Sequence, residues 1–270
     1  MSRKDAPRFA QCEGDELKLR LDKLILQRGL APSRERAQAL VLAGRVLVNE
    51  QKVEKSGASV DEEATLRILG DDMPFVSRGG LKLARAMEHW HIDVRGKVCM
   101  DIGASTGGFA DCLLQNGAAQ VIAVDTGYGQ IDVTLRSDPR VRLLEKTNAR
   151  YLTAEQLWPD AMQRDPISLV AMDVSFISAR LVLPAVTRCA RESVACGEFE
   201  LVVLVKPQFE MGREYVGKGG IVRDAEAQER AVQQVSATVA DLGGVEIEVI
   251  ESPILGAEGN REFLMHARCR

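Results

Sequence analysis

The sequence predicts an α/β protein whose core is an open, mostly parallel sheet with helices on both faces, preceded by a small α+β domain. Three observations predict this fold class. From residue 77 onward, short apolar runs alternate with longer helical patterns, which is the order expected of a parallel sheet. Residues 98–109, VCMDIGASTGGF, read as a buried strand that enters a helix through a glycine loop, as in Rossmann-like domains. Residues 17–69 instead contain two helical patterns followed by short strands.

Hydrophobic periodicity and turn residues predict the elements in order. In the small domain, one helix should run from Leu19 to a cap at Gly29 and a second from the N-cap Ser33 to Gly44. Short strands should flank a turn at Asn49-Glu50, with another strand at 64–69. In the larger domain a helix should begin after Gly80, followed by strands at 98–101, 121–125, 141–145, 168–173, 200–205, 245–250 and 262–267, with helices at 107–116, 154–162, 178–193 and 224–242. The last two strands should form an antiparallel hairpin at one edge of the sheet.

Composition divides the chain into four segments. Residues 1–16 are polar and aperiodic, so they are expected to form a mobile arm. Residues 17–69 form the small domain. The acidic, proline-interrupted sequence GDDMP marks residues 70–76 as the linker, and residues 77–270 form the Rossmann-like domain.

Charge, hydropathy and cysteine usage limit the classes of function that this protein can have. The net charge is −4 and 46% of the residues are hydrophobic, which is enough for a packed core. No apolar run approaches the length of a membrane span, and the N-terminus lacks the apolar core of a signal peptide, so a cytoplasmic protein is expected. The six cysteines include no C-x-x-C pair and the three histidines complete no zinc pattern, so neither a disulfide framework nor a metal site is expected. Residues 17–55 contain nine basic and four acidic residues, which concentrates positive charge in the small domain.

The glycine loop is the main candidate for a ligand site, because its backbone N–H groups and the following helix N-terminus can approach a ligand closely. Asp101 precedes the first glycine and suits a positively charged group, such as the amino group of S-adenosylmethionine, better than a phosphate. A second strand ends at Asp125, where a Rossmann-type domain places its ribose-hydroxyl acceptor. The cofactor-binding candidates are Asp101, Gly103, Ala104, Ser105, Thr106, Gly107, Gly108, Phe109, Asp125, Asn148, Ala149 and Asp173. The pattern leaves open a distorted dinucleotide site and a turn that binds no ligand.

Four ionisable residues are expected to meet just beyond the carboxyl ends of the strands, where an open parallel sheet forms a crevice. Asp173 and Lys206 each end a strand, and Glu262 opens the last one. Lys82 lies in the first turn of a helix, where its charge is unfavourable to the helix dipole. The glycine-rich stretch after Lys206 is too long for an ordinary connection. A lysine beside a second cation retains some neutral amine near pH 7, so Lys206 is the candidate general base, the alternative being a lysine that reaches to the surface.

The small domain resembles the S4 RNA-binding domain. The matching segments are Arg20-Leu-Asp-Lys23, Ser33-Arg34 and Gly44-Arg-Val-Leu-Val-Asn49. In that family, the second helix and the following turn offer basic side chains to RNA phosphates. The resemblance therefore implies a set of RNA-binding candidates, Arg20, Lys23, Ser33, Arg34, Arg36, Arg45 and Lys52. A solvated helix face is the alternative for any one of these arginines.

The whole chain resembles the TlyA family of ribosomal RNA 2′-O-methyltransferases, in which an S4 domain precedes an FtsJ-like methyltransferase domain. The matching segments are SRGGLKL, DIGASTGGFADCLL, AVDTGYGQ, EKTNAR, MDVSFIS, LVKPQFE, GKGGIVRD and GNREFL. The family uses a Lys-Asp-Lys-Glu tetrad, which falls here on Lys82, Asp173, Lys206 and Glu262. The resemblance implies S-adenosylmethionine as cofactor and ribosomal RNA or ribosomal subunits as partner. A monomer is expected.

Two other function classes remain as hypotheses. One is an RNA-binding factor for ribosome assembly whose Rossmann-like domain is catalytically silent, although all four tetrad positions and both cofactor carboxylates are intact. The other is the membrane-active haemolysin that the family name suggests, which the absence of a spanning segment or a strongly basic amphipathic helix disfavours.

Overall fold

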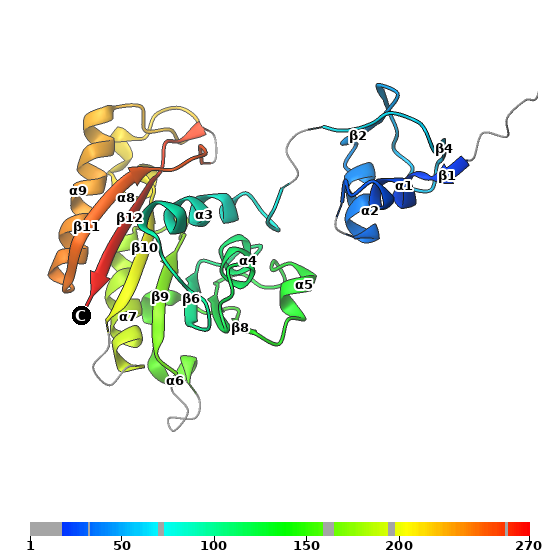
Figure 1. The fold of residues 1–270 in the computed structure, drawn as a ribbon. Helices are drawn as coiled ribbons and strands as arrows, with labels where there is room; N and C mark the ends of the chain where they lie inside the picture. Colours follow the sequence, from blue (N-terminus) through cyan, green and yellow to red (C-terminus); the bar gives the residue numbers. More distant parts are fainter. Residues whose placement is uncertain (1–17, 32, 70–72, 159–164, 194–197, 257–258) are drawn as a thin grey trace, which may run out of the picture. The chain divides into compact units, whose positions relative to one another are not determined.

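The computed structural model describes residues 18–31, 33–69, 73–158, 165–193, 198–256 and 259–270. The chain forms two compact units, residues 1–72 and 73–270 (Figure 1). The predicted arm at 1–16 lies outside the described residues, as do positions 70–72 of the predicted linker. The prediction ended the linker at residue 76, whereas Phe75 and Val76 pack against the core of the second unit.

The N-terminal unit has its own core, built mainly from the apolar faces of two helices. Its elements are β1 (Lys18–Arg20), α1 (Leu21–Gln27), α2 (Arg34–Leu42), β2 (Val46–Val48), β3 (Gln51–Lys52), β4 (Ser59–Asp61) and β5 (Leu66–Ile68). As predicted, Ser33 caps α2 and the turn between β2 and β3 lies at Asn49 and Glu50, both with positive φ. The first helix was predicted from Leu19, which is wrong, because residues 18–20 are extended and pair with β4.

The second unit is a seven-stranded sheet with the order β11-β12-β10-β9-β6-β7-β8. Its strands are β6 (Val98–Ile102), β7 (Gln120–Val124), β8 (Val141–Leu144), β9 (Ile167–Met172), β10 (Phe199–Val205), β11 (Gly244–Glu251) and β12 (Phe263–Cys269). Strands β10, β9, β6, β7 and β8 are parallel to one another. The predicted α/β class and the predicted edge hairpin are both confirmed, because β11 pairs antiparallel with β12. Since β12 also pairs antiparallel with β10, the final strand lies inside the sheet rather than at its edge.

Helices cover both faces of this sheet (Figure 1). The helical elements are α3 (Gly79–Trp90), α4 (Gly108–Gln115), α5 (Val133–Arg136), η1 (Ala149–Tyr151), α6 (Ala154–Leu157), α7 (Ala179–Glu192), α8 (Pro207–Glu210), η2 (Arg213–Tyr215) and α9 (Ala225–Asp241). Side chains of α3, α4 and α5 share one core with one face of the strands, whereas α6, α7 and α9 share a second core with the other face. Neighbouring residues such as Val121 and Ile122 belong to opposite cores, which is the period-two pattern of a strand buried on both sides.

The helices of this unit differ from the prediction in two ways. The predicted helix at 154–162 is α6, which ends at Leu157, and residues 159–162 lie outside the described part of the chain. The short helix α5 was not predicted. In the part of the chain that the structure describes, no helix is both long enough and apolar enough to cross a membrane.

Candidate active site

Two adjoining cavities open at the carboxyl ends of the parallel strands. One measures about 300 Å³ and the other about 290 Å³, and both are lined by Gly103, Ser105, Asp173 and Ser175. Each is near the lower end of the size range of small-molecule sites, which is about 300–1,000 Å³. Together they form a crevice in the position where open α/β sheets bind their ligands.

The first cavity is lined by the residues that were predicted to contact the nucleoside part of a cofactor. Asp125, Asn148 and Ala149 line it, as predicted candidates for contacts to ribose and adenine. The Asp125 carboxylate accepts hydrogen bonds from the backbone N–H groups of Ser105 at 2.8 Å and Gly127 at 2.6 Å. The same carboxylate therefore fixes the glycine loop to the loop after β7.

The second cavity begins at the glycine loop. Gly103 has a φ of +87°, and a Cβ at this position would overlap the carbonyl group of Asp173. The backbone at Gly103 therefore packs so closely against the Asp173 carbonyl that only glycine fits at this position. Ala104, Thr106, Gly108 and Phe109 line this cavity. Gly107 is in the lining set of neither cavity, and its φ of +94° instead sets the turn into α4.

Asp101 lies at the base of the second cavity and is fully buried. Its Oδ2 accepts a hydrogen bond from the Ala110 N–H at 2.9 Å, whereas no described atom forms a hydrogen bond to its Oδ1. Burial raises the pKa of Asp101 to about 8, and the nearby carboxylates of Asp173 and Asp125 contribute to that shift. A buried carboxylate oxygen without a partner favours a cationic ligand group.

The four tetrad candidates form two ion pairs at the second cavity. Lys206 Nζ lies 2.6 Å from Asp173 Oδ1, and Lys82 Nζ lies 2.5 Å from Glu262 Oε2. Lys82, Asp173 and Lys206 line the cavity, whereas Glu262 contacts Lys82 from outside the lining set. The structure thus brings all four residues together and gives each lysine its own carboxylate.

Two residues that the sequence analysis missed stand beside the tetrad. Ser175 Oγ accepts a hydrogen bond from Lys206 Nζ at 2.8 Å. Phe176 exposes 92% of its surface, has a φ of +64° and lies with its ring centre 5.4 Å from that of Phe209. An exposed aromatic side chain in a strained backbone conformation is a frequent feature of ligand sites. The sequence signals for both residues were their position just after Asp173 and their place in the segment MDVSFIS.

In the N-terminal unit, one buried carboxylate holds two of the predicted RNA-binding arginines. Asp22 accepts hydrogen bonds from Arg20 at 2.9 and 3.1 Å, from Arg34 at 3.1 Å and from Gln38 at 2.9 Å. Hydrogen bonds from Arg20 are the main reason that the pKa of Asp22 lies below its usual range. The side chains of Arg20 and Arg34 remain 47% and 44% exposed, so both guanidinium groups still reach solvent.

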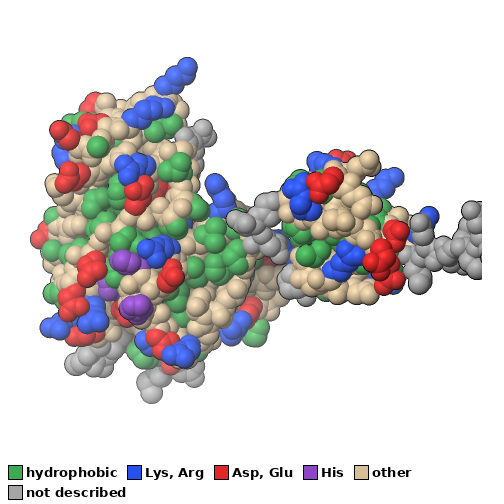
Figure 2. All heavy atoms as spheres, turned by 45° about the horizontal axis from the view of Figure 1, so that its top comes forward, with side chains coloured by type: hydrophobic (Ala, Val, Ile, Leu, Met, Phe, Trp, Pro, Cys, Tyr) green, Lys and Arg blue, Asp and Glu red, His purple; other side chains and the backbone are tan. Residues whose placement is uncertain are grey.

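The other RNA-binding candidates have varied environments. Lys23 and Lys52 are exposed, and Arg45 donates a hydrogen bond to the Leu69 carbonyl at 2.8 Å. Ser33 Oγ accepts a hydrogen bond from the backbone N–H of Arg36 at 3.2 Å, which is a capping role. Figure 2 shows basic side chains next to acidic ones on the visible face of this unit. The local excess of basic residues is thus not a patch of one sign on that face.

The fold and the crevice define the class of protein as a Rossmann-like methyltransferase. A family model for FtsJ-like methyltransferases matches residues 75–269, and a model for the S4 domain matches residues 19–66. The chain belongs to the FtsJ-like methyltransferase family and, within it, to the TlyA group that also carries an S4 domain.

Relatives and solved structures of similar length support this assignment. The chain is 42% identical to the 16S/23S rRNA (cytidine-2′-O)-methyltransferase TlyA of Mycobacterium tuberculosis, over 92% of this chain and 89% of that protein. It is 39% identical to Hemolysin A of Brachyspira hyodysenteriae, over 92% of this chain and 99% of that protein. A solved structure of a presumed hemolysin from Streptococcus thermophilus is 40% identical, has a TM-score of 0.68, and is matched over 94% of this chain and 89% of that one.

Proposed function

We propose that this protein transfers a methyl group from S-adenosylmethionine to the 2′-hydroxyl of a nucleotide in ribosomal RNA. The observation that carries the proposal is the Lys206–Asp173 ion pair in the wall of a cavity that begins at the glycine loop. The activity for which the Mycobacterium tuberculosis relative is named supports the same reaction and the same class of substrate.

The residues of the crevice fit S-adenosylmethionine. Asp101 Oδ1, which has no hydrogen-bond partner among the described residues, suits the amino group of the methionine part, and Gly103, Ala104 and Gly108 line the same cavity. Asp125, Asn148 and Ala149 would hold the nucleoside part in the first cavity. When bound, this cofactor supplies an electrophilic methyl group on a sulfonium, so the protein has to supply mainly position and a base.

Lys206 is the proposed general base. Its amine takes the proton of the ribose hydroxyl as the oxygen attacks, and the ammonium that forms is stabilised by Asp173 and by a hydrogen bond to Ser175. Glu262 holds Lys82 through the second ion pair, which leaves the Lys82 ammonium to orient the hydroxyl or the developing alkoxide. Phe176, exposed in the wall of the first cavity, offers a face on which a base of the bound nucleotide can stack.

The N-terminal unit would supply the affinity for RNA. Exposed Lys23 and Lys52 and the half-exposed Arg20 and Arg34 are suited to phosphate contacts, which position the RNA without reading its sequence.

The test is transfer of labelled methyl from S-adenosylmethionine to purified ribosomal subunits and to free ribosomal RNA, followed by mapping of the modified nucleotide. Lys206→Ala should reduce the rate at least about 100-fold, since general-base catalysis contributes roughly 10²–10⁴-fold. Lys97→Ala is the matched control, because Lys97 directly precedes β6, at the amino end of the parallel strands.

Near wild-type transfer by Lys206→Ala would overturn the assignment of the base. No transfer by the wild-type protein to any RNA would instead favour the catalytically silent assembly factor.

A further inference from the structure

The loops that follow β9 and β10 are joined at three levels. Nearest the strands, Lys206 contacts Asp173 and Ser175. In the middle, the rings of Phe176 and Phe209 lie against each other. Farthest from the strands, the short helix α8 ends at Glu210, and the carboxylate of that residue meets the start of α7.

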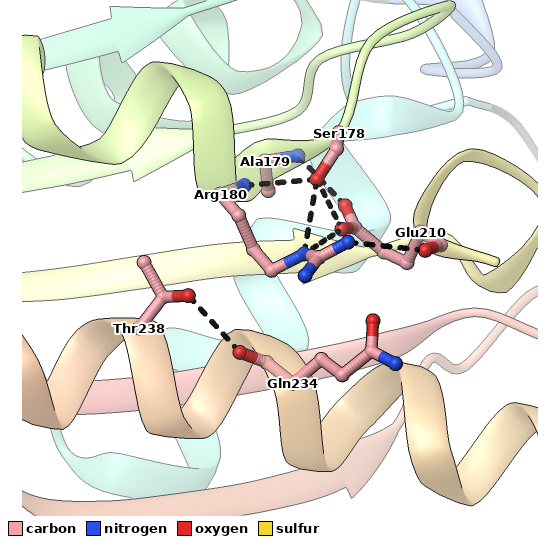
Figure 3. Close-up of polar contacts among 6 residues, drawn as sticks. All are labelled: Ser178, Ala179, Arg180, Glu210, Gln234 and Thr238. Atoms are coloured by element: carbon pink, nitrogen blue, oxygen red, sulfur yellow. Dashed lines mark hydrogen bonds and ion pairs between the residues drawn. The ribbon is translucent and has the colours of Figure 1, made fainter.

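Figure 3 shows this third connection. The Glu210 side chain is only 2% exposed. Its carboxylate accepts hydrogen bonds from the Ala179 N–H at 2.7 Å and from Ser178 Oγ at 2.5 Å, and it pairs with Arg180 Nε at 3.2 Å. Arg180 Nη2 also donates to the Glu210 backbone carbonyl at 3.3 Å. One buried carboxylate therefore fastens α8 to the first turn of α7.

Capping of α7 alone does not explain this carboxylate. Ser178 already caps the helix, because its Oγ accepts a hydrogen bond from the Arg180 N–H at 3.2 Å. Burying a charged group costs desolvation energy, which is offset here by the Ala179 N–H, Ser178 Oγ and Arg180 Nε. The bonds of Glu210 connect two segments that come from different strands, so their effect is on the relative position of those segments.

We infer that Glu210 is a positioning residue for methyl transfer, which holds Asp173 and Ser175 against Lys206. The loop 173–178 is fixed at its start by a hydrogen bond from the Asp173 N–H to the Ile102 carbonyl at 2.9 Å, and at its end by Glu210. Between these two points Phe176 keeps its positive φ. Without Glu210 the end of the loop is released, and a displacement of about 1 Å can reduce a rate about 100-fold.

This inference rests on the proposed function, and its test measures kcat and KM separately. Glu210→Ala should lower kcat about 10- to 100-fold while the KM for RNA changes less than about threefold, because the residue touches neither proposed ligand. Glu210→Gln, which keeps the shape and part of the hydrogen bonding, should retain more activity than Glu210→Ala. Thr187→Val is the control, since it removes a buried hydrogen bond, from Thr187 Oγ1 to the Leu183 carbonyl, elsewhere in α7.

A double-mutant cycle separates positioning from general loss of stability. If Glu210 acts through the groups around Lys206, the kcat losses of Glu210→Ala and Ser175→Ala should be clearly less than additive. Fully additive losses, or a kcat equal to that of Thr187→Val, would overturn the inference.

Hydrogen exchange of the ligand-free protein tests the same link without catalysis. Glu210→Ala should speed amide exchange in residues 173–180 roughly tenfold and leave residues 98–109 unchanged. If the wild-type protein methylates RNA but exchange and kcat of the variant are unchanged, only the inference fails. If no RNA is methylated, the proposed function fails, and the exchange experiment still decides whether Glu210 holds the loop.

Discussion

Asp101 combines a buried carboxyl group with a raised pKa. Its Oδ1 is buried without a hydrogen-bond partner among the described residues, and burial raises its pKa to about 8, against about 3.9 in an unfolded chain. The folded state therefore holds this proton more tightly than the unfolded state does. It follows that the free energy of unfolding contributed by Asp101 falls as the pH rises from about 4 to about 8.

The substitution Asp101→Asn should therefore stabilise the free protein while weakening cofactor binding. The amide of the variant does not titrate. The unfolding temperature of the variant should therefore exceed that of the wild type by a larger margin at pH 9 than at pH 6. The affinity of the variant for S-adenosylmethionine should fall about 10- to 100-fold, since a hydrogen bond to a charged group contributes about 1.5–3 kcal/mol. Thermal unfolding with and without the cofactor at both pH values measures both effects. An equal rise in unfolding temperature on cofactor addition in both proteins would contradict the proposed contact.

At the scale of elements, the site depends on how closely the N-termini of α3 and α4 approach each other. A Cβ at Gly108 would lie 2.9 Å from the Gly80 backbone nitrogen and would overlap Ser77 Oγ. At Gly79 the nearest heavy atom to an added Cβ is 3.5 Å away, which is ordinary van der Waals contact. Because α3 carries Lys82, this contact between helices also sets the position of the Lys82–Glu262 pair.

Alanine substitutions at Gly108 and Gly79 test this contact between the two helices. Gly108→Ala should force the helices apart and lower the free energy of unfolding by about 1–3 kcal/mol, the usual cost of overpacking. It should also lower the rate of methyl transfer, because Lys82 moves with α3. Gly79→Ala should leave the unfolding temperature unchanged or raise it slightly, because alanine favours the helix. Equal unfolding temperatures for the two variants, measured by calorimetry, would show that the helix contact tolerates a side chain at Gly108.

Across the whole chain, the excess of basic residues is concentrated in one segment of the N-terminal unit. The chain carries a net charge of −4, yet residues 17–55 carry nine basic against four acidic residues. Attraction to RNA phosphates should therefore arise mainly from the N-terminal unit, whereas the crevice of the second unit supplies the chemistry.

The double substitution Lys23→Gln with Lys52→Gln should test this division. If each lysine neutralises one phosphate, the slope of log affinity against log salt concentration should decrease by about 1.4–1.8. The kcat at saturating RNA should stay at the wild-type value, since neither residue belongs to the crevice. Filter binding over a range of salt concentrations and methyl-transfer kinetics measure the two quantities, with Lys97→Gln as the control. A lower kcat with unchanged affinity would assign these lysines to catalysis instead of binding.

The fold class and the short list of candidate site residues could be predicted from the sequence alone. Both are encoded locally, because a strand buried on both faces gives an apolar run, and a glycine loop needs particular residues at fixed spacing. For the same reason Ser33 was recognisable as a cap and Asn49-Glu50 as a turn. The Rossmann-like sheet with its crevice at the strand ends follows from the order of these local patterns.

Which groups meet in the site depends on tertiary contacts. Lys82 pairs with Glu262 although 180 positions separate them in the sequence, and β12 lies between β10 and β11. Leu19, which continues a helical pattern, is instead in a strand because β4 offers it backbone partners. Glu210 is buried against α7 by the path of two loops. Pairing between strands, loop conformation and the partners of buried charges depend on contacts between distant residues, and no local pattern contains that information.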